Sequence, residues 1–251
     1  MRISTTRTES EPQKRYTTAP WTTSPARRTT SSSTGSKTSS PRRPDRVTAP
    51  SRTLGIAFSD GDRTSHVAGA VLRADGTLDG LGFETCTVGG TDATDAVIAL
   101  FDRLGRADVR HVAVAGIAPA WFNLLDLRRV HEAVDRPAYA VSYESSPGLE
   151  PALREAFDGD ALADRLDIYR DVPPRVRVDR ASADSDEDGS ETSESRVPAS
   201  RAPLFVRAAG IDTGEAAEAV RGLVREGFRR PEPLRVAALA ASAHREASGG
   251  E

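Results

Sequence analysis

The sequence has few of the features that mark secreted, membrane or metal-cluster proteins. Its 251 residues include one cysteine, Cys86, which excludes an internal disulfide and a cysteine-rich metal site. No apolar run approaches the length of a membrane span, and no apolar signal region follows the N-terminus. These absences argue against the secreted and membrane classes, so we expect a soluble cytoplasmic protein without a membrane partner.

Aromatic residues and lysine are also scarce. Aromatic residues make up only 5% of the chain, so the core must consist mainly of Val, Leu, Ala and Ile. Lysine occurs only at Lys14 and Lys37, and residues 1–50 carry a net charge of +7 against −10 for residues 51–251. An acidic, lysine-free body is typical of halophilic proteins, and a GC-rich genome produces the same composition. It lacks the basic footprint that is usual in DNA-binding proteins.

Two segments lack the apolar periodicity of a folded chain. Residues 1–50 include 21 Ser or Thr, and such a segment buries too little surface to offset its ordering entropy. We expect a disordered tail there; the alternatives are an organelle-targeting peptide and a start codon assigned too far upstream of Val47. Residues 179–202 are acidic and Ser-rich, which predicts a mobile surface loop. Their spacing does not match a calcium-binding EF-hand loop.

The rest of the chain, residues 52–246, predicts one α/β domain. The expected strands are residues 53–58, 66–73, 81–88, 112–114, 138–143 and 204–208. The expected helices are residues 91–104, 123–134, 149–157, 161–170, 213–226 and 233–245. Three hairpin-joined strands followed by helix–strand–helix–strand is the order of a ribonuclease-H-like domain, a mixed sheet flanked by helices.

The stretch 111–134 is where we expect chemistry. It reads as a short apolar strand, a tight turn and a helix, with Asn123 as the expected N-cap. The carboxyl end of a strand is where α/β sheets present binding residues. Trp121 and Phe122 could stack there on an unpaired base, or they could serve as core anchors. Asp126 falls in the first turn of the expected helix, where an acid complements the helix dipole.

Two further segments border this expected site. Asp92 follows Gly89 and Gly90 at a predicted helix start, either as an acid that complements the helix dipole or as part of an anion-binding N-terminus. Residues 143–146 (Tyr-Glu-Ser-Ser) end the fifth predicted strand, beside the same edge of the sheet. We expect them to line a pocket.

Several separated motifs resemble one known family. The motifs are Leu-Gly-Ile at 54–56, Thr-Asp-Ala-Thr-Asp-Ala at 91–96, Gly-Ile at 116–117 and Phe-Asn-x-x-Asp at 122–126. From about residue 52 to 242 the chain is similar to an archaeal family long called domain of unknown function ninety-nine. That family is also called endonuclease dU and is similar to endonuclease V.

The resemblance implies a ribonuclease-H-like fold and a DNA-repair endonuclease that acts at deaminated bases, especially deoxyuridine. It also implies Mg²⁺, because two such ions held by acids from neighbouring strands can stabilise the attacking and leaving oxygens of phosphodiester cleavage. Endonuclease-V-like enzymes place these acids on the first strand, on a following strand and at the end of the fourth.

The chain departs from the family pattern at two of the acid positions. Many relatives read Gly-Ile-Asp in the first strand and Asp-Gly-Ile in the fourth. Here the corresponding triplets end in Ala57 and begin with Ala115. Alanine has no side-chain oxygen to give to a metal.

Three remaining acids form the candidate catalytic set. Glu84 is the counterpart of the third-strand acid, Asp60 or Asp62 could swing in from the turn after the first strand, and Asp126 could swing in from the helix after the fourth. Asp60 and Glu84 are then the candidate metal ligands. The structural alternatives are a solvated edge-strand face for Glu84 and ordinary turn chemistry for Asp60.

Two hypotheses of different class follow. The first is a Mg²⁺-dependent endonuclease acting on DNA at deaminated bases. The second is a catalytically inactive relative that binds DNA, RNA or a nucleotide through Trp121, Phe122, Asn123 and Asp92, without a metal. A structural partner protein is a third, weaker option.

Overall fold

The computed structural model describes residues 51–179 and 203–249, so the tail expected at 1–50 and nearly all of the loop expected at 179–202 lie outside the described residues. The strands in the described part are β1 (Arg52–Asp60), β2 (Thr64–Arg73), β3 (Leu78–Thr87), β4 (His111–Ala115), β5 (Ala138–Ser142), β6 (Val176–Val178) and β7 (Leu204–Ala209). The helices are α1 (Ala93–Leu104), α2 (Pro119–Phe122), α3 (Leu127–Val134), α4 (Glu150–Ala156), α5 (Gly159–Asp171), α6 (Thr213–Leu223) and α7 (Glu232–Ala247).

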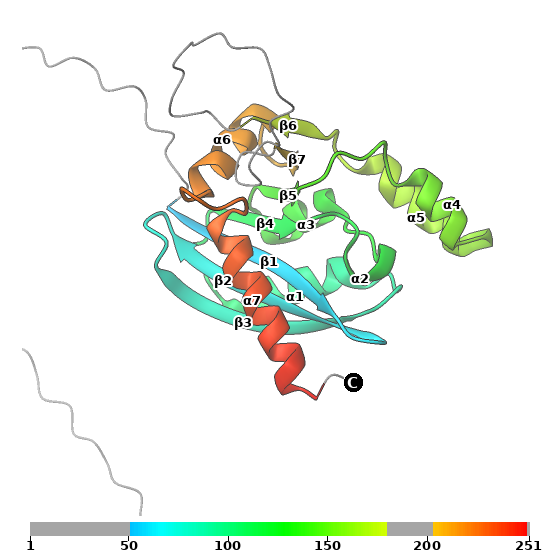
Figure 1. Ribbon diagram of the computed structural model, residues 1–251, viewed down its shortest axis with the longest axis horizontal. Helices are drawn as coiled ribbons and strands as arrows, with labels where there is room; N and C mark the ends of the chain where they lie inside the picture. The colour runs from blue at the N-terminus through cyan, green and yellow to red at the C-terminus, as the bar shows by residue number, and fades with distance from the viewer. Residues whose placement is uncertain (1–50, 180–202, 250–251) are drawn as a thin grey trace, which may run out of the picture. The chain divides into compact units, whose positions relative to one another are not determined.

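These strands form one sheet in the order β3-β2-β1-β4-β5-β7-β6 (Figure 1). Strands β1, β2 and β3 form an antiparallel meander, β4 pairs parallel to β1, and β5 pairs parallel to β4. Strand β7 is antiparallel to β5 and carries the short strand β6, which the sequence pattern did not predict. This confirms the ribonuclease-H-like arrangement. It also brings the carboxyl ends of β1, β4 and β5 to one edge of the sheet.

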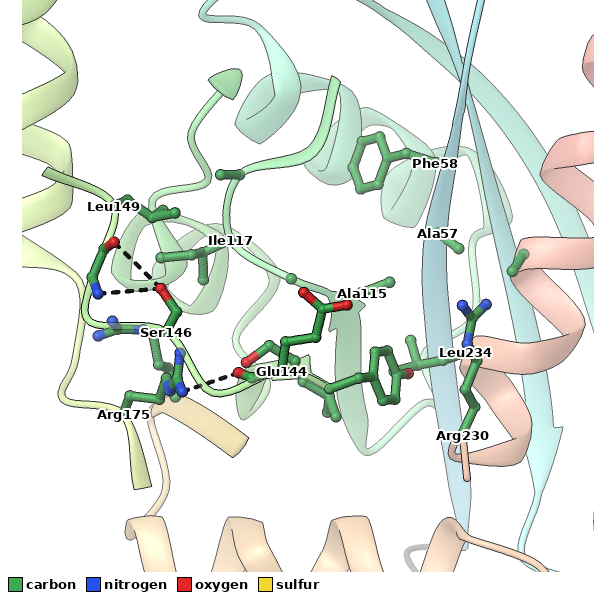
Figure 2. A pocket seen from close by; sticks show the side chains of 18 of the residues that line it. Ala57, Phe58, Ala115, Ile117, Glu144, Ser146, Leu149, Arg175, Arg230 and Leu234 are labelled. Carbon is green, nitrogen blue, oxygen red and sulfur yellow. Dashed lines mark hydrogen bonds between the residues drawn. The ribbon is translucent and has the colours of Figure 1, made fainter. Parts of the chain in front are cut away.

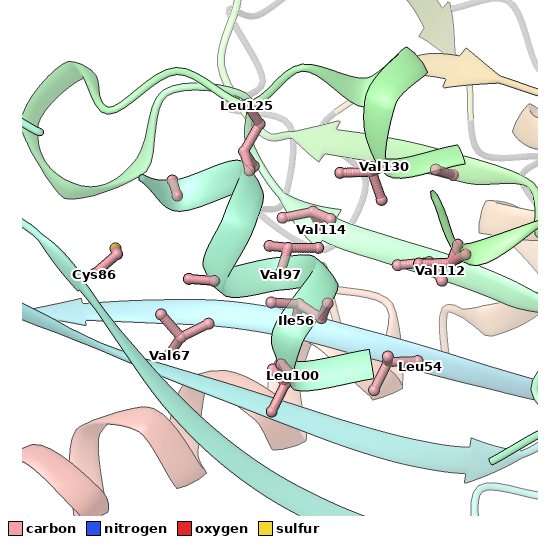
Figure 3. Packing of buried hydrophobic residues seen from close by; sticks show 14 of the residues in the cluster. Leu54, Ile56, Val67, Cys86, Val97, Leu100, Val112, Val114, Leu125 and Val130 are labelled. Atoms are coloured by element: carbon pink, nitrogen blue, oxygen red, sulfur yellow. The ribbon is translucent and has the colours of Figure 1, made fainter. Parts of the chain in front are cut away.

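Alternating side chains of β1 divide the core into two layers. Leu54 and Ile56 point toward α1 and pack in a cluster with Val97 and Leu100 (Figure 3). Ala57 points the other way and packs in a cluster with Ala237 of α7, the helix that crosses β1 and β2 on the opposite face (Figure 1). The two layers of helices therefore use the two faces of the same strands.

Gly55 lets α7 approach the sheet. A Cβ atom at this position would lie 2.3 Å from the backbone carbon of Pro233 and 2.4 Å from its oxygen. Both are backbone atoms at the start of α7, so they cannot rotate away as a side chain could. The first-strand Gly-Ile motif therefore has a packing reason: only glycine leaves room for the helix.

The described helices include none that is both long enough and apolar enough to cross a membrane.

Candidate functional site

A pocket of about 520 Å³ opens at the carboxyl ends of β1, β4 and β5, beside α7 (Figure 2). Ala57 of β1 and Ala115 of β4 line it, and Leu234 of α7 closes one side. Tyr143 and Glu144, which follow β5, also line it, as their place in the sequence predicts. The pocket thus lies where the topology of the sheet predicts a binding site.

The charged side chains of this pocket are mainly arginines. Arg175, Arg207 and Arg230 line it, and Glu144 is the only carboxylate among the described lining residues. The Arg175 guanidinium lies 4.0 Å from the centre of the Phe205 ring and donates to the Glu144 carbonyl oxygen at 3.1 Å. These groups give the pocket a net positive charge, because a guanidinium stays protonated in proteins.

Two of the arginines are held by the protein. Arg207 donates from Nη1 to the Pro173 carbonyl oxygen at 2.6 Å, and burial lowers the pKa of its guanidinium. Arg230 lies over the Tyr143 ring, 5.2 Å from its centre. Burial raises the pKa of Tyr143 to about 12, so its hydroxyl is neutral near pH 7. That hydroxyl is buried and has no hydrogen-bond partner among the described residues.

The three candidate catalytic acids are not brought together. Glu84 faces α1, where its carboxylate lies 2.5 Å from Arg103 Nη2, whereas its neighbour Phe83 stacks on His244 of α7 on the other face. Asp60 accepts a hydrogen bond from the Ser65 hydroxyl at 2.6 Å. None of Glu84, Asp60, Asp62 and Asp126 lines the pocket.

The residues present do not fit the magnesium site that the resemblance implies. Mg²⁺ prefers carboxylate oxygens, and the two strand-end positions in the pocket are Ala57 and Ala115. Across residues 51–179 and 203–249, no group of three or more His, Cys, Asp or Glu side chains could hold a metal ion.

The expected helix start at Asn123 is wrong. Helix α3 begins at Leu127, and Asp126 is its N-cap, with the carboxylate accepting from the Arg129 N–H at 3.0 Å. Asn123 is instead fully buried, and its Oδ1 accepts from the Ala93 N–H at 2.9 Å, at the start of α1. The residues around Asn123 in the sequence do not predict this contact with α1, because its partners lie about thirty positions earlier in the chain.

The Asn123 amide also ties α1 to β3. Its Nδ2 donates to the Thr87 carbonyl oxygen at 2.8 Å and to Asp92 Oδ1 at 2.7 Å. Asp92 accepts in turn from the Thr87 N–H and hydroxyl, and its side chain makes no cap hydrogen bond to its own helix. The start of α1 is therefore capped by Asn123, from a later segment of the chain, and not by the side chain of its own N-cap residue, Asp92.

Trp121 is presented by a left-handed turn. Ala120, Trp121 and Phe122 have φ angles of 47°, 51° and 60°, a region that costs roughly 1–2 kcal/mol per residue for non-glycine side chains. Such backbone persists only where its surroundings hold it. Here the Gly89 N–H donates to the Ala120 carbonyl oxygen at 2.7 Å, and the buried Arg165 donates from Nε to the Phe122 carbonyl oxygen at 3.2 Å.

The two aromatic side chains of this turn differ in exposure. Trp121 is 54% exposed, and its ring centre lies 5.1 Å from that of Phe157. Phe122 is partly buried and packs against a cluster that includes Leu149, a pocket residue. The Trp121 ring is thus available to a ligand at the surface, while Phe122 serves as an anchor of the turn.

A histidine pair joins α7 to β2. The Nδ1 atoms of His66 and His244 lie 2.9 Å apart, so one of the two must be unprotonated to accept the hydrogen bond. Burial lowers the pKa of His66, and the nearby His244 and Arg245 lower it further. The folded protein therefore favours the neutral His66 ring.

Stability is expected to fall on acidification because of this pair. A histidine whose pKa is lower in the folded state contributes its full stability above about pH 6.5, and loses it as the pH falls below that value. Thermal unfolding followed from pH 7.5 to 5.5 should show a smaller fall in Tm for His66→Gln than for the wild type. Burial also lowers the pKa of His111, but that contribution is the same in both proteins. Equal falls would contradict the assignment to His66.

The sequence comparisons with known proteins agree with one another. A profile of the family described as Endonuclease dU matches residues 50–245. A UPF0215 protein from Thermococcus kodakarensis is 31% identical over 201 residues, covering 76% of this chain and 91% of that protein. A UPF0215 protein from Pyrobaculum calidifontis is 29% identical over 191 residues, covering 76% of this chain and 93% of that protein.

One solved structure supports the fold. The crystal structure of a protein of unknown function from Archaeoglobus fulgidus has a TM-score of 0.61 at 24% identity, covering 77% of this chain and 97% of that chain. Endonuclease V from Bacillus subtilis has a TM-score of 0.47 at 11% identity, covering 79% of this chain and 82% of that chain. The profile match spans both described segments almost entirely. The chain belongs to the endonuclease dU family.

Proposed function

We propose that this chain recognises a deaminated nucleotide in DNA and holds it in the pocket at the carboxyl ends of β1, β4 and β5 without cutting the strand. One observation carries the proposal. The pocket presents three arginines where a magnesium-dependent nuclease would present carboxylates, and Ala57 and Ala115 occupy the strand-end positions.

The charge of the pocket suits a phosphate-bearing ligand. Guanidinium groups donate to phosphate oxygens with good geometry, and Arg175, Arg207 and Arg230 come from three separate segments of the chain. The volume of about 520 Å³ falls within the usual range for small-molecule pockets, which suits one nucleotide taken out of a stack. Residues 51–251 are acidic as a whole, but the pocket itself is positively charged and can therefore attract a phosphate group.

Trp121 supplies the second contact in the proposal. An exposed aromatic ring can stack on a base and contributes about 1–3 kcal/mol in single-strand-binding proteins. Ala120 and Phe122 of the strained turn pack inward, whereas Trp121 is 54% exposed and is left for a ligand. The family's description as endonuclease dU supports a preference for deaminated bases, because deoxyuridine is the product of deoxycytidine deamination.

Family membership favours a second candidate, a metal-dependent endonuclease with Asp60, Glu84 and Asp126 as its acids. That function requires the three carboxylates to converge, which means that Glu84 must leave Arg103 and the α1 face of the sheet. The binding function requires no such rearrangement, so we favour it.

Removing a pocket arginine should weaken binding of uracil-containing single-stranded DNA. For Arg230→Ala and Arg175→Ala we expect about a tenfold rise in Kd at low salt, and the log–log salt slope should fall by about 0.7 for each phosphate that the variant no longer neutralises. Fluorescence anisotropy across a salt series measures both quantities.

The matched control is Arg170→Ala. Arg170 lies on α5 outside the pocket, where it is 61% exposed and pairs with Asp167. Its removal should leave Kd nearly unchanged. Equal losses of affinity for Arg170→Ala and the two pocket variants would contradict the pocket as the binding site.

A further inference from the structure

Arg165 of α5 is a buried cation whose hydrogen bonds go to main-chain oxygens. It is 3% exposed, and its guanidinium lies 3.9 Å from the centre of the Phe157 ring. Nε donates to the Phe122 carbonyl oxygen at 3.2 Å, and Nη2 donates to the carbonyl oxygens of Gly89 at 2.6 Å and Gly90 at 3.0 Å. A further hydrogen bond, from Nη1, stays within its own helix at 2.9 Å. One side chain therefore joins three segments, which are α5, the loop after β3 and the left-handed turn of α2.

These same segments support the Trp121 ring. A Cβ atom on Gly89 would lie 2.8 Å from Cε3 of that ring, so the ring rests directly on the glycine. The Gly89 N–H also donates at 2.7 Å to the carbonyl oxygen of Ala120, the residue before Trp121. The ring centre lies 5.1 Å from that of Phe157. Arg165 thus contacts the glycine, the turn and the aromatic neighbour that together fix where the ring lies.

The shape of the guanidinium explains why an arginine stands at this position. A buried cation loses its hydration, and a well-packed apolar side chain of similar volume is often no less stable in its place. A guanidinium, however, is a planar fork of five N–H donors, which can reach several carbonyl oxygens at once. The ammonium group of lysine is a compact point charge and cannot reproduce that fork. The fork holds a turn whose left-handed φ values persist only where the surroundings impose them.

From this, and resting on the proposed function, we infer that Arg165 is a positioning residue, which holds the Trp121 ring rigidly in place for a base of the bound strand to stack on. A ring that is fixed before binding loses less conformational freedom when the base arrives. Arg165 is itself buried, so it contacts no ligand and neutralises no phosphate. Its effect on binding must therefore pass through Trp121, and that effect must disappear when the ring is removed.

The test is a double-mutant cycle on the Kd of uracil-containing single-stranded DNA, measured by fluorescence anisotropy across a salt series. Arg165→Lys should raise Kd about fivefold, the lower end of what one stacked base contributes. The log–log salt slope should stay at its wild-type value, because no phosphate contact is lost. In a Trp121→Ala background the same change should alter Kd less than about twofold. Arg170→Lys, an exposed position of the same helix, is the control and should leave Kd unchanged in both backgrounds.

Tryptophan emission tests the positioning without DNA. Trp21 and Trp121 are the two tryptophans of the chain, so in a Trp21→Phe variant the emission reports on Trp121 alone. Arg165→Lys should lower the steady-state anisotropy of this emission and increase its quenching by acrylamide, because the ring gains freedom to move. Arg170→Lys should change neither quantity. Unchanged anisotropy and quenching in Arg165→Lys would overturn the inference.

Gly89→Ala is the second variant, for the case in which Arg165→Lys does not fold. Its methyl group would meet the Trp121 ring at 2.8 Å and displace it, while the guanidinium of Arg165 is left in place. We expect a similar rise in Kd, and again less than about twofold in the Trp121→Ala background. A rise that persists without the ring would contradict the role given to this contact.

The outcomes separate this inference from the function on which it rests. If Trp121→Ala weakens binding and Arg165→Lys raises Kd equally with and without the ring, the positioning role is overturned while the binding function stands. If Trp121→Ala leaves Kd unchanged, the inference fails together with the stacking contact, and the pocket arginines still stand. If the wild type does not bind the strand, the proposed function itself fails.

Discussion

Gly55→Ala should lower the free energy of unfolding by about 3 kcal/mol, at the upper end of the usual cost of overpacking a core. The added methyl group would meet the Pro233 carbonyl carbon at 2.3 Å, well inside van der Waals contact. Helix α7 must then move away from β1. Because Leu234 of α7 closes one side of the pocket, binding should weaken together with stability. Chemical denaturation followed by circular dichroism measures the change in stability.

Gly80→Ala is the matched control for this prediction. Gly80 lies in the edge strand β3, and a Cβ atom there would come no closer than 3.4 Å to a neighbour, Arg106 Nη1. We expect a change of less than about 1 kcal/mol, since the new methyl group would make only ordinary van der Waals contacts. If Gly55→Ala costs no more than Gly80→Ala, the close approach of α7 to β1 is not as described.

Asn123→Ala should also lower the free energy of unfolding by about 3 kcal/mol. The fully buried amide accepts from the Ala93 N–H and donates to the Thr87 oxygen and to Asp92. Alanine leaves these buried groups without partners, and each unsatisfied group costs about 1–3 kcal/mol. For a domain of this size the destabilisation corresponds to a fall in Tm of about 8 °C, which calorimetry resolves.

Asp95→Ala tests whether the effect belongs to the buried amide. Asp95 lies in the first turn of the same helix, α1, but it is 61% exposed and pairs with Arg129 at the surface. Exposed ion pairs contribute less than about 1 kcal/mol, so Tm should fall by no more than about 3 °C. Comparable falls for the two variants would mean that Asn123 does not carry the connection between α1 and β3.

The fold was predictable because its signals are local. Apolar runs and turn residues predict β1, β2, β4 and β5, and hairpin spacing predicts the antiparallel meander. The helix start near Asn123 was not predictable from the same signals. A side chain that satisfies a distant helix looks in sequence like a cap of its own helix, and the three residues before Asn123 take left-handed φ values that no local propensity favours.

The position of the site was more predictable than its chemistry. Parallel strands bring their carboxyl ends together, so residues after β4 and β5 were expected to border a pocket, and Tyr143 and Glu144 do. The arginines were not found, because Arg175, Arg207 and Arg230 lie in segments that share no motif and meet only through the sheet. Side chains alternate along a strand, so Glu84 faces away from Phe83, but alternation does not tell which face the pocket uses.

The central claim is that the pocket binds a deaminated nucleotide through arginines and without a metal. The most direct measurement incubates the full chain with labelled uracil-containing single-stranded DNA, in Mg²⁺ or in EDTA, and follows anisotropy and strand nicking in the same samples. We expect the same Kd in both conditions, a weaker Kd for the cytosine-containing strand, and no nicking in either. Lesion-specific nicking that appears in Mg²⁺ and is abolished by Glu84→Ala would contradict the account, because it would show that the separated carboxylates assemble a catalytic site.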